Sequence, residues 1–277
     1  MRSPVVALDH LKLRVSDLDA AIRCYQALFD SSPITNRQQA DDLGAVFVTP
    51  NVILQLTTDE HPTGLTEVAM AVDDDDRIRR RLKRLGLRYE RDLNLDPLAK
   101  TEEFRASMAL KIEDTLNIRG LALHFAHRPA REALLATSKN GASLGLDHLV
   151  VSSSDPSGTA FLFAAQLGLD MRLDMQNDKW GGRFLFFRCG DLIVEVVGGL
   201  GNRAKDSQAE QSEDYCTQDE FYGLSWRVSD ADAARARLLD ADFDVSELRD
   251  GRRPGTTVFT LKDTATGTPT LVLQPPS

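Results

Sequence analysis

Short runs in which apolar and polar residues alternate recur along the chain, and several are followed by a helical pattern. The clearest case lies at 146–199, where an alternating run that begins with Asp147-His148 precedes an amphipathic segment at 155–167 and three further strand-like runs. Alternation with period two predicts strands with one buried face, and a period near 3.6 predicts a helix. This stretch therefore predicts one β-α-β-β-β unit.

The same order of elements opens the chain, where LDHLKLRVSDLDAAIRCYQALFD predicts strand, cap and helix, and GAVFVTPNVILQLTTD predicts a hairpin. Phe47 to Gln55 spans 55 − 47 = 8 residues, and Phe187 to Glu195 spans 195 − 187 = 8. The two closing strands are therefore in register, and Gln55 is expected where Glu195 stands. Weaker copies of the pattern follow each of these two units, so internal repetition organises the chain.

The repeats divide the sequence into an N-terminal domain, a linker and a C-terminal domain. We expect modules at 1–59 and 64–127, a linker at 128–144, and modules at 145–199 and 220–277, so that the domains span 1–127 and 145–277. Between the last two modules, the polar stretch 199–219 is expected to be a mobile loop, with a lid as the alternative. The acidic run Asp73 to Asp76 favours helix capping over a calcium site, because it stands at a strand-to-helix junction.

Composition excludes several classes of protein. The net charge of −9 and pI near 5.1 argue against a sequence-independent nucleic-acid binder, which needs a basic surface. No apolar run approaches the roughly 18 residues of a membrane span, and the first residues do not resemble a signal peptide, so a cytoplasmic protein is expected. The three cysteines fit neither a metal motif nor a disulfide framework: Cys24, Cys189 and Cys216.

Side chains alternate between the two faces of a strand. One residue of the first strand and one of the closing strand should therefore occupy equivalent positions, on the same face, in every module. Most of these positions hold side chains with nitrogen or oxygen donors. The eight expected positions are His10, Gln55, Glu67, His124, His148, Glu195, Gly223 and Gln274.

The openings LDHLKLRVSDLDAAIRCYQALF and LDHLVVSSSDPSGTAFLFAAQLGL, with the closing LIVEVVGG, resemble the vicinal oxygen chelate superfamily, which includes glyoxalase I, extradiol dioxygenases and bleomycin-resistance proteins. The resemblance implies an α+β fold in which four βαβββ modules pair into two curved, barrel-like mixed sheets. It also implies one divalent transition metal, with Zn, Ni, Mn and Fe all compatible with imidazole and carboxylate ligands.

The pairing of modules decides which ligands meet, and the sequence leaves it open. If the second and third modules pair, the resemblance implies a metal site of Glu67, His124, His148 and Glu195, with Glu195 and Glu67 as the catalytic base and its partner. If consecutive modules pair, one cleft holds His10, Gln55, Glu67 and His124, and the other holds His148, Glu195 and Gln274. His10 is the second choice as a ligand.

The resemblance implies a metal-dependent lyase or isomerase of the glyoxalase type that acts on a small oxygenated organic substrate through an enediolate. The alternative is a metal-free small-molecule binding or resistance protein of the same fold. A ring-cleaving dioxygenase is disfavoured, because Gly223 and Gln274 stand where its second histidine and its glutamate are expected. We expect neither nucleic acid nor a membrane as partner, and either a monomer or a homodimer.

Three further features are candidates for shaping a pocket. Trp180 precedes a strand and is expected either in a pocket wall or in ordinary packing. Lys12, Arg14 and Arg227 lie on the ligand face by alternation, which favours an anionic substrate unless they extend to solvent. The turn at 250–256 carries two arginines, although a hairpin turn requires only its glycine and proline.

Overall fold

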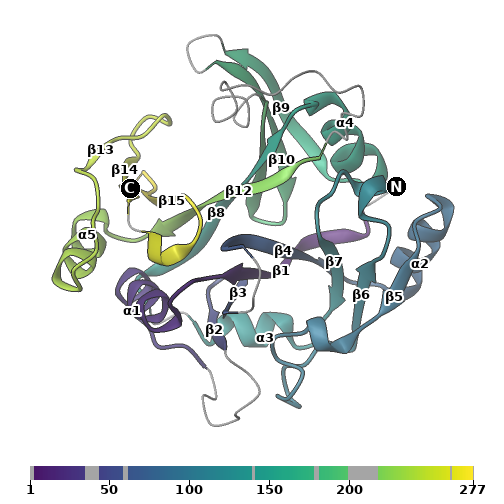
Figure 1. The fold of residues 1–277 in the computed structure, drawn as a ribbon, viewed down its shortest axis with the longest axis horizontal. Helices are drawn as coiled ribbons and strands as arrows, with labels where there is room; N and C mark the ends of the chain where they lie inside the picture. Colours follow the sequence, from purple (N-terminus) through teal and green to yellow (C-terminus); the bar gives the residue numbers. More distant parts are fainter. Residues whose placement is uncertain are drawn as a thin grey trace.

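The computed structural model describes residues 3–34, 44–58, 62–138, 141–177, 181–198, 218–262 and 264–276. In this part of the chain two mixed, open sheets of seven and eight strands carry the helices (Figure 1). The predicted α+β architecture of four units in two curved sheets is confirmed.

The first sheet contains the first two units, in the strand order β2-β3-β1-β4-β7-β6-β5. Its strands are β1 (Val5–Arg14), β2 (Gly44–Val48), β3 (Ile53–Thr57), β4 (Gly64–Val72), β5 (Tyr89–Arg91), β6 (Met108–Ile112) and β7 (Leu123–His127). The helices of this half are α1 (Leu18–Phe29), α2 (Asp75–Arg84) and α3 (Arg131–Ala136), with short 3-10 turns at Leu93–Leu95 and Thr115–Ile118.

The second sheet contains the last two units, in the order β13-β14-β15-β12-β8-β11-β10-β9. Its strands are β8 (Ser143–Ser153), β9 (Asp170–Asn177), β10 (Gly182–Cys189), β11 (Leu192–Gly198), β12 (Glu220–Val228), β13 (Arg249–Asp250), β14 (Thr257–Leu261) and β15 (Thr270–Gln274). Helix α4 (Pro156–Ala160) continues as a π-helical turn at Phe161–Gln166, and α5 (Ala231–Asp240) and a 3-10 turn at Thr264–Thr266 follow.

One aspartate caps the first helix of every unit. In each case its side chain accepts a hydrogen bond from the backbone N–H three residues later, which satisfies a donor that the helix leaves unpaired. The capping residues are Asp17, Asp74, Asp155 and Asp230. The capping interpretation of the acidic run at 73–76 is therefore confirmed.

The two sheets share one hydrophobic core. Leu11 and Leu13 of β1 belong to it, and so do Leu149 and Val151 of β8, all fully buried. Trp226 of β12 packs against helix α1 of the first half, with its ring centroid 4.8 Å from that of Phe29. Helices α1, α2 and α5 contribute residues to this core, and the opposite, concave face of each sheet points away from it (Figure 1).

Among the helices of the described residues, none is both long and apolar enough to cross a membrane.

Candidate functional site

The capping aspartates fix the equivalent positions in the first strands. Each position lies seven residues before its cap, as 17 − 10 and 155 − 148 show. The four equivalent residues are His10, Glu67, His148 and Gly223, as the sequence predicts.

The register of the parallel strands fixes the closing positions, each opposite the residue two places after the first-strand position. In the first three units the pairs are Lys12–Gln55, Ala69–His124 and Val150–Glu195. In the fourth unit Ser225 pairs with Leu271, so the expectation for Gln274 is wrong. The Oε1 of Gln274 instead accepts a hydrogen bond from the backbone N–H of Ala231, at the start of α5.

The four residues predicted as metal ligands divide between the two sheets. Glu67 and His124 lie on β4 and β7, whereas His148 and Glu195 lie on β8 and β11. Consecutive units pair, so the alternative in which the second and third units share a sheet is wrong. Among the described residues no group of three or more His, Cys, Asp or Glu side chains is arranged to hold a metal ion.

On the first sheet, Glu67 binds its own neighbours. Its carboxylate lies 3.0 Å from Nε2 of His124 and 3.1 Å from Nζ of Lys12, and Nη2 of Arg14 is 3.9 Å away. Burial raises the pKa of Glu67, but the hydrogen bonds and charges of His124 and Lys12 outweigh it and lower the pKa to about 2. Glu67 is therefore an ionised structural partner at neutral pH.

His10 is also held within the protein. Its Nδ1 lies 2.9 Å from Oδ2 of Asp9, and the residue is 2% exposed. Arg128 bridges Asp9 to Asp96, with Nη2 at 2.9 Å and 2.7 Å from the two carboxylates. Burial raises the pKa of Asp9, but hydrogen bonds from His10 and Arg128 lower it well below its usual range.

The connection from β5 to β6, residues 92–107, covers this part of the concave face. Its Leu98 and Phe104 pack in a small apolar cluster with Val46 of β2, Ile53 of β3 and Leu134 of α3. Because the chain itself occupies this end of the first sheet, His10 has no open cleft before it.

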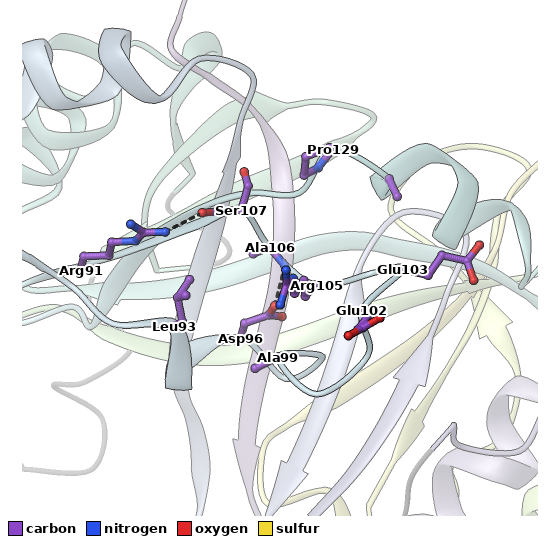
Figure 2. A pocket seen from close by; sticks show the side chains of 11 residues that line it. Arg91, Leu93, Asp96, Ala99, Glu102, Glu103, Arg105, Ala106, Ser107 and Pro129 are labelled. Atoms are coloured by element: carbon purple, nitrogen blue, oxygen red, sulfur yellow. Dashed lines mark hydrogen bonds between the residues drawn. The ribbon is translucent and has the colours of Figure 1, made fainter.

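A hollow of about 560 Å³ lies on this connection, lined by Arg91, Glu102, Glu103 and Arg105 among others (Figure 2). Its buried carboxylate, Asp96, already accepts hydrogen bonds from the backbone N–H groups of Leu98 and Ala106 as well as from Arg128. The lining mixes both signs of charge, and its buried carboxylate is already bound within the protein, so we assign no site here.

The second sheet, in contrast, holds a cleft of about 1070 Å³ on its concave face. His148 and Glu195 line its floor, and Phe184, Phe186 and Leu271 belong to its apolar walls. A cavity of this size that combines apolar walls with convergent polar groups is typical of a small-molecule site.

Asp147, His148 and Glu195 form a chain of contacts in this cleft. Nδ1 of His148 lies 2.9 Å from Oδ2 of Asp147, and its Nε2 lies 3.5 Å from Oε2 of Glu195. Burial raises the pKa of Asp147, but the hydrogen bond from His148 and the charges of His148, Arg227 and Arg253 lower it overall. An ionised Asp147 accepts a hydrogen bond from Nδ1–H of His148, so Nε2 of His148 faces Glu195.

Arg227 supports the same end of the cleft. Its Nη2 donates to the carbonyl of Leu146 and to Asp191, both at 3.0 Å, and its Nε lies 3.9 Å from Asp147. Of the three basic residues predicted on the ligand faces, Lys12 and Arg14 are held by Glu67 and Arg227 lines the open cleft.

Sequence reasoning did not identify Asp147 as part of the site. The signal was available, because the dipeptide Asp-His occurs at the same place in the first and third units, at 9–10 and 147–148. Trp180, Cys216 and most of the polar stretch 199–219 lie outside the described residues.

Comparison with known proteins supports the fold. No family model matches the sequence, and no curated protein matches it. Solved structures match over almost the whole chain. The Mn(II)-bound glyoxalase from Novosphingobium aromaticivorans is 14% identical and matches with a TM-score of 0.67. The match covers 98% of this chain and 83% of the glyoxalase chain.

Two dioxygenases have a similar fold. The 2,3-dioxygenase LapB from Pseudomonas sp. KL28 is 12% identical, with coverage of 100% and 94% and a TM-score of 0.67. A catechol 2,3-dioxygenase is 16% identical, with coverage of 99% and 94% and a TM-score of 0.64. The paired βαβββ units, the two open mixed sheets and these matches together show that the chain has the vicinal oxygen chelate fold, which it shares with glyoxalases and extradiol dioxygenases.

Proposed function

We propose that the protein binds a small oxygenated organic molecule in the cleft of the second sheet and catalyses a proton transfer on it, as a lyase or isomerase. The observation that carries the proposal is the chain from Asp147 through His148 to Glu195 on the floor of a cavity of about 1070 Å³. An imidazole and a carboxylate within reach of one bound molecule are the usual pair for general acid–base catalysis.

The roles follow from the contacts. Asp147 accepts a hydrogen bond from Nδ1–H of His148, so Nε2 of His148 is the atom that accepts or returns a proton in the cleft. Glu195, 3.5 Å away, is the second group. The pair starts with one transferable proton on one of its two groups. The group without it removes a proton from carbon as negative charge develops on the neighbouring substrate oxygen, and the other group delivers its proton to an adjacent atom. The pair therefore ends with one proton again, and the reaction needs no oxidant.

The metal-dependent lyase that the sequence predicts is the second candidate. A histidine that binds a metal through one ring nitrogen usually donates a hydrogen bond from the other nitrogen to a carboxylate. Asp147 is such a carboxylate for Nδ1 of His148. However, the remaining two equivalent positions are Gly223 and Leu271, which have no donor side chain. The second sheet therefore offers two protein ligands, fewer than the three of ordinary catalytic metal sites.

The proposal can be tested by proton exchange in D₂O. A panel of 2-oxo acids and 2-hydroxyketones is incubated with protein treated with EDTA, and exchange at the carbon next to the carbonyl is followed by NMR. The wild type should accelerate exchange, and His148→Ala and Glu195→Gln should each lose about 10²–10⁴-fold of the rate. His127→Ala is the matched control, because His127 also contacts an aspartate, Asp75, at 2.6 Å, but outside the cleft.

The outcomes separate the candidates. Exchange that EDTA abolishes and one metal ion restores supports the metal-dependent lyase. Binding of panel members without exchange supports the metal-free binding protein that the sequence left as an alternative. No binding and no exchange, or equal rates in the wild type and His148→Ala, would contradict the proposal.

A further inference from the structure

The turn that joins β13 to β14, residues 251–256, reaches across the cleft of the second sheet. β13 is one edge of that sheet and β10 lies next to the opposite edge, with five strands between them in the sheet order. Even so, Cζ of Arg252 lies 5.9 Å from the centre of the Phe184 ring on β10. The curvature of the sheet therefore brings this turn over the apolar wall of the cavity.

Local hydrogen bonds hold the turn in one conformation. The Oγ1 of Thr256 donates a 2.6 Å hydrogen bond to the carbonyl of Arg253, and the backbone N–H of Thr256 donates to the same carbonyl at 3.1 Å. A Cβ added at Gly251 would collide with the side chain of Thr256, so glycine is needed there. The positions of Arg252 and Arg253 at the rim follow from these local contacts.

The rim makes the cleft positive in an acidic protein. Four arginines line the cavity, and the carboxylates that line it are Asp147, Glu195 and Asp250, so its ionised groups sum to 4 − 3 = +1 with histidine neutral. The whole chain carries −9. The four arginines are Arg227, Arg249, Arg252 and Arg253.

The four arginines differ in the hydrogen bonds and ion pairs that their guanidinium groups make within the protein. Arg227 is held by Asp191 and a carbonyl, and Arg249 has a long contact of 3.4 Å to Thr260. The Arg253 guanidinium, in contrast, makes no hydrogen bond or ion pair within 4 Å to any residue that the structure describes. It still lies close enough to Asp147 for its charge to help lower the pKa of that carboxyl, after burial and His148. Arg253 thus lines the same cavity as His148 and Glu195, with its guanidinium donors available.

We propose that the molecule acted on at His148 and Glu195 is an organic carboxylate with an apolar body, and that Arg253, with Arg252 beside it, binds the carboxylate at the rim of the cleft. The inference rests on the proposed function and names its substrate class. Arginine binds carboxylates through two parallel hydrogen bonds, and the apolar body would lie along Phe184, Phe186 and Leu271. A local charge of +1 suits a monoanion better than a dianionic phosphate ester.

Isothermal titration calorimetry with three probes of one shape tests this inference. The probes are 2-naphthoate, its neutral amide 2-naphthamide, and 2-naphthyl phosphate. In the wild type, naphthoate should bind about tenfold more tightly than the amide, because a hydrogen-bonded charge pair is worth about that much. Arg253→Gln should remove most of this preference and leave amide binding unchanged, and Arg252→Gln should weaken naphthoate binding by less.

Arg80→Gln is the matched control, because Arg80 is an exposed arginine on α2 of the first half. Equal affinity of the wild type for acid and amide, an unchanged preference in Arg253→Gln, or tighter binding of the phosphate than of naphthoate would each overturn the inference. Binding of acid and amide alike, with proton exchange that still depends on His148, would leave the proposed function standing. Failure of all probes to bind and of all exchange would contradict both.

Discussion

At the scale of the residue, two copies of the same dipeptide have different environments. Asp9-His10 and Asp147-His148 both place the histidine Nδ1 2.9 Å from the carboxylate before it. In the first copy Arg128 binds the same carboxylate, and His10 is 2% exposed. The side chain of His148 is 19% exposed and opens into the cleft. The chemistry available to each histidine is decided by what covers it.

Glu67 allows a prediction about stability against pH. Its pKa falls from 4.5 to about 2 on folding, so its ionised form stabilises the protein above about pH 4.5, and this contribution is lost as the pH falls toward 2. Glu67→Gln should reduce the free energy of unfolding by about 1–3 kcal/mol at pH 7. The difference from wild type should shrink between pH 5 and pH 2, as measured by urea denaturation.

Glu90→Gln is the control for this experiment. Glu90 pairs with Lys111 at 3.9 Å on the same sheet, but its side chain is 49% exposed, and exposed pairs contribute under about 1 kcal/mol. A loss in Glu67→Gln that is the same at pH 7 and pH 2.5 would show that the carboxylate charge is not the cause.

At the scale of the element, the same connection differs in the second and fourth units. Between β5 and β6 it has 107 − 92 + 1 = 16 residues, and between β13 and β14 it has 256 − 251 + 1 = 6. The long connection packs Leu98 and Phe104 onto the first sheet, whereas the short one lies over the second cleft. The length and apolar content of one loop thus determine which concave face remains open.

The long connection is tied to the sheet through Arg128, which is buried between Asp9 and Asp96. Arg128→Met should reduce the free energy of unfolding by about 3–5 kcal/mol, because two buried carboxylates lose their counterion. Hydrogen exchange in residues 92–107 should also become faster. Arg105→Met, at an exposed position of the same connection, should change stability by under about 0.5 kcal/mol.

A second substitution separates charge from packing. If unpaired carboxylates cause the loss, adding Asp9→Asn to Arg128→Met should recover part of the stability. No recovery, together with unchanged exchange in 92–107, would mean that the ion pairs do not hold this connection in place.

The elements also show how much of the structure could be predicted from the sequence. The first-strand positions were predictable because each stands at a fixed distance from a capping aspartate. The closing position of the fourth unit was not, because alternation in TPTLVLQ does not fix which residue faces Ser225, and the polar Gln274 was preferred to Leu271. The pairing of units was left open since either pairing buries the same alternating faces. The predicted domain boundaries stay a prediction.

At the scale of the whole molecule, the halves depend on one another. Helix α1 of the first half contacts α5 of the second, and Arg81 of α2 donates to the carbonyls of Gln166 and Ala165 at 2.6 Å and 2.7 Å. Arg119 binds Asp219 through Nε at 2.7 Å, which is a further tie between the halves. Because these ties flank a shared hydrophobic core, we expect the two halves to unfold together.

Trp226 provides the test of that expectation. It is fully buried and lies edge-on to Phe29 and Tyr25 of α1. Trp226→Ala should reduce the free energy of unfolding by about 3–5 kcal/mol, as large-to-small core substitutions do. Hydrogen exchange should accelerate in β4 of the first sheet as well as in β11 of the second. Leu239→Ala, at a position that is 43% exposed, is the control. Loss of protection confined to the second sheet would show that the halves unfold separately.

Residues 92–107 fill the concave face of the first sheet, and this has a consequence for the effect of amino-acid substitutions in the two halves. One sheet has its concave face filled by the chain itself and the other has it open, so substitutions on the two faces act on different properties. Substitutions around Asp9 and Arg128 should alter how much folded protein accumulates, while those around His148 and Arg253 should alter what the folded protein does. In a library of variants measured for both abundance and ligand response, substitutions on the concave face of the first sheet should therefore mainly lower abundance. Those on the concave face of the second sheet should mainly change the ligand response.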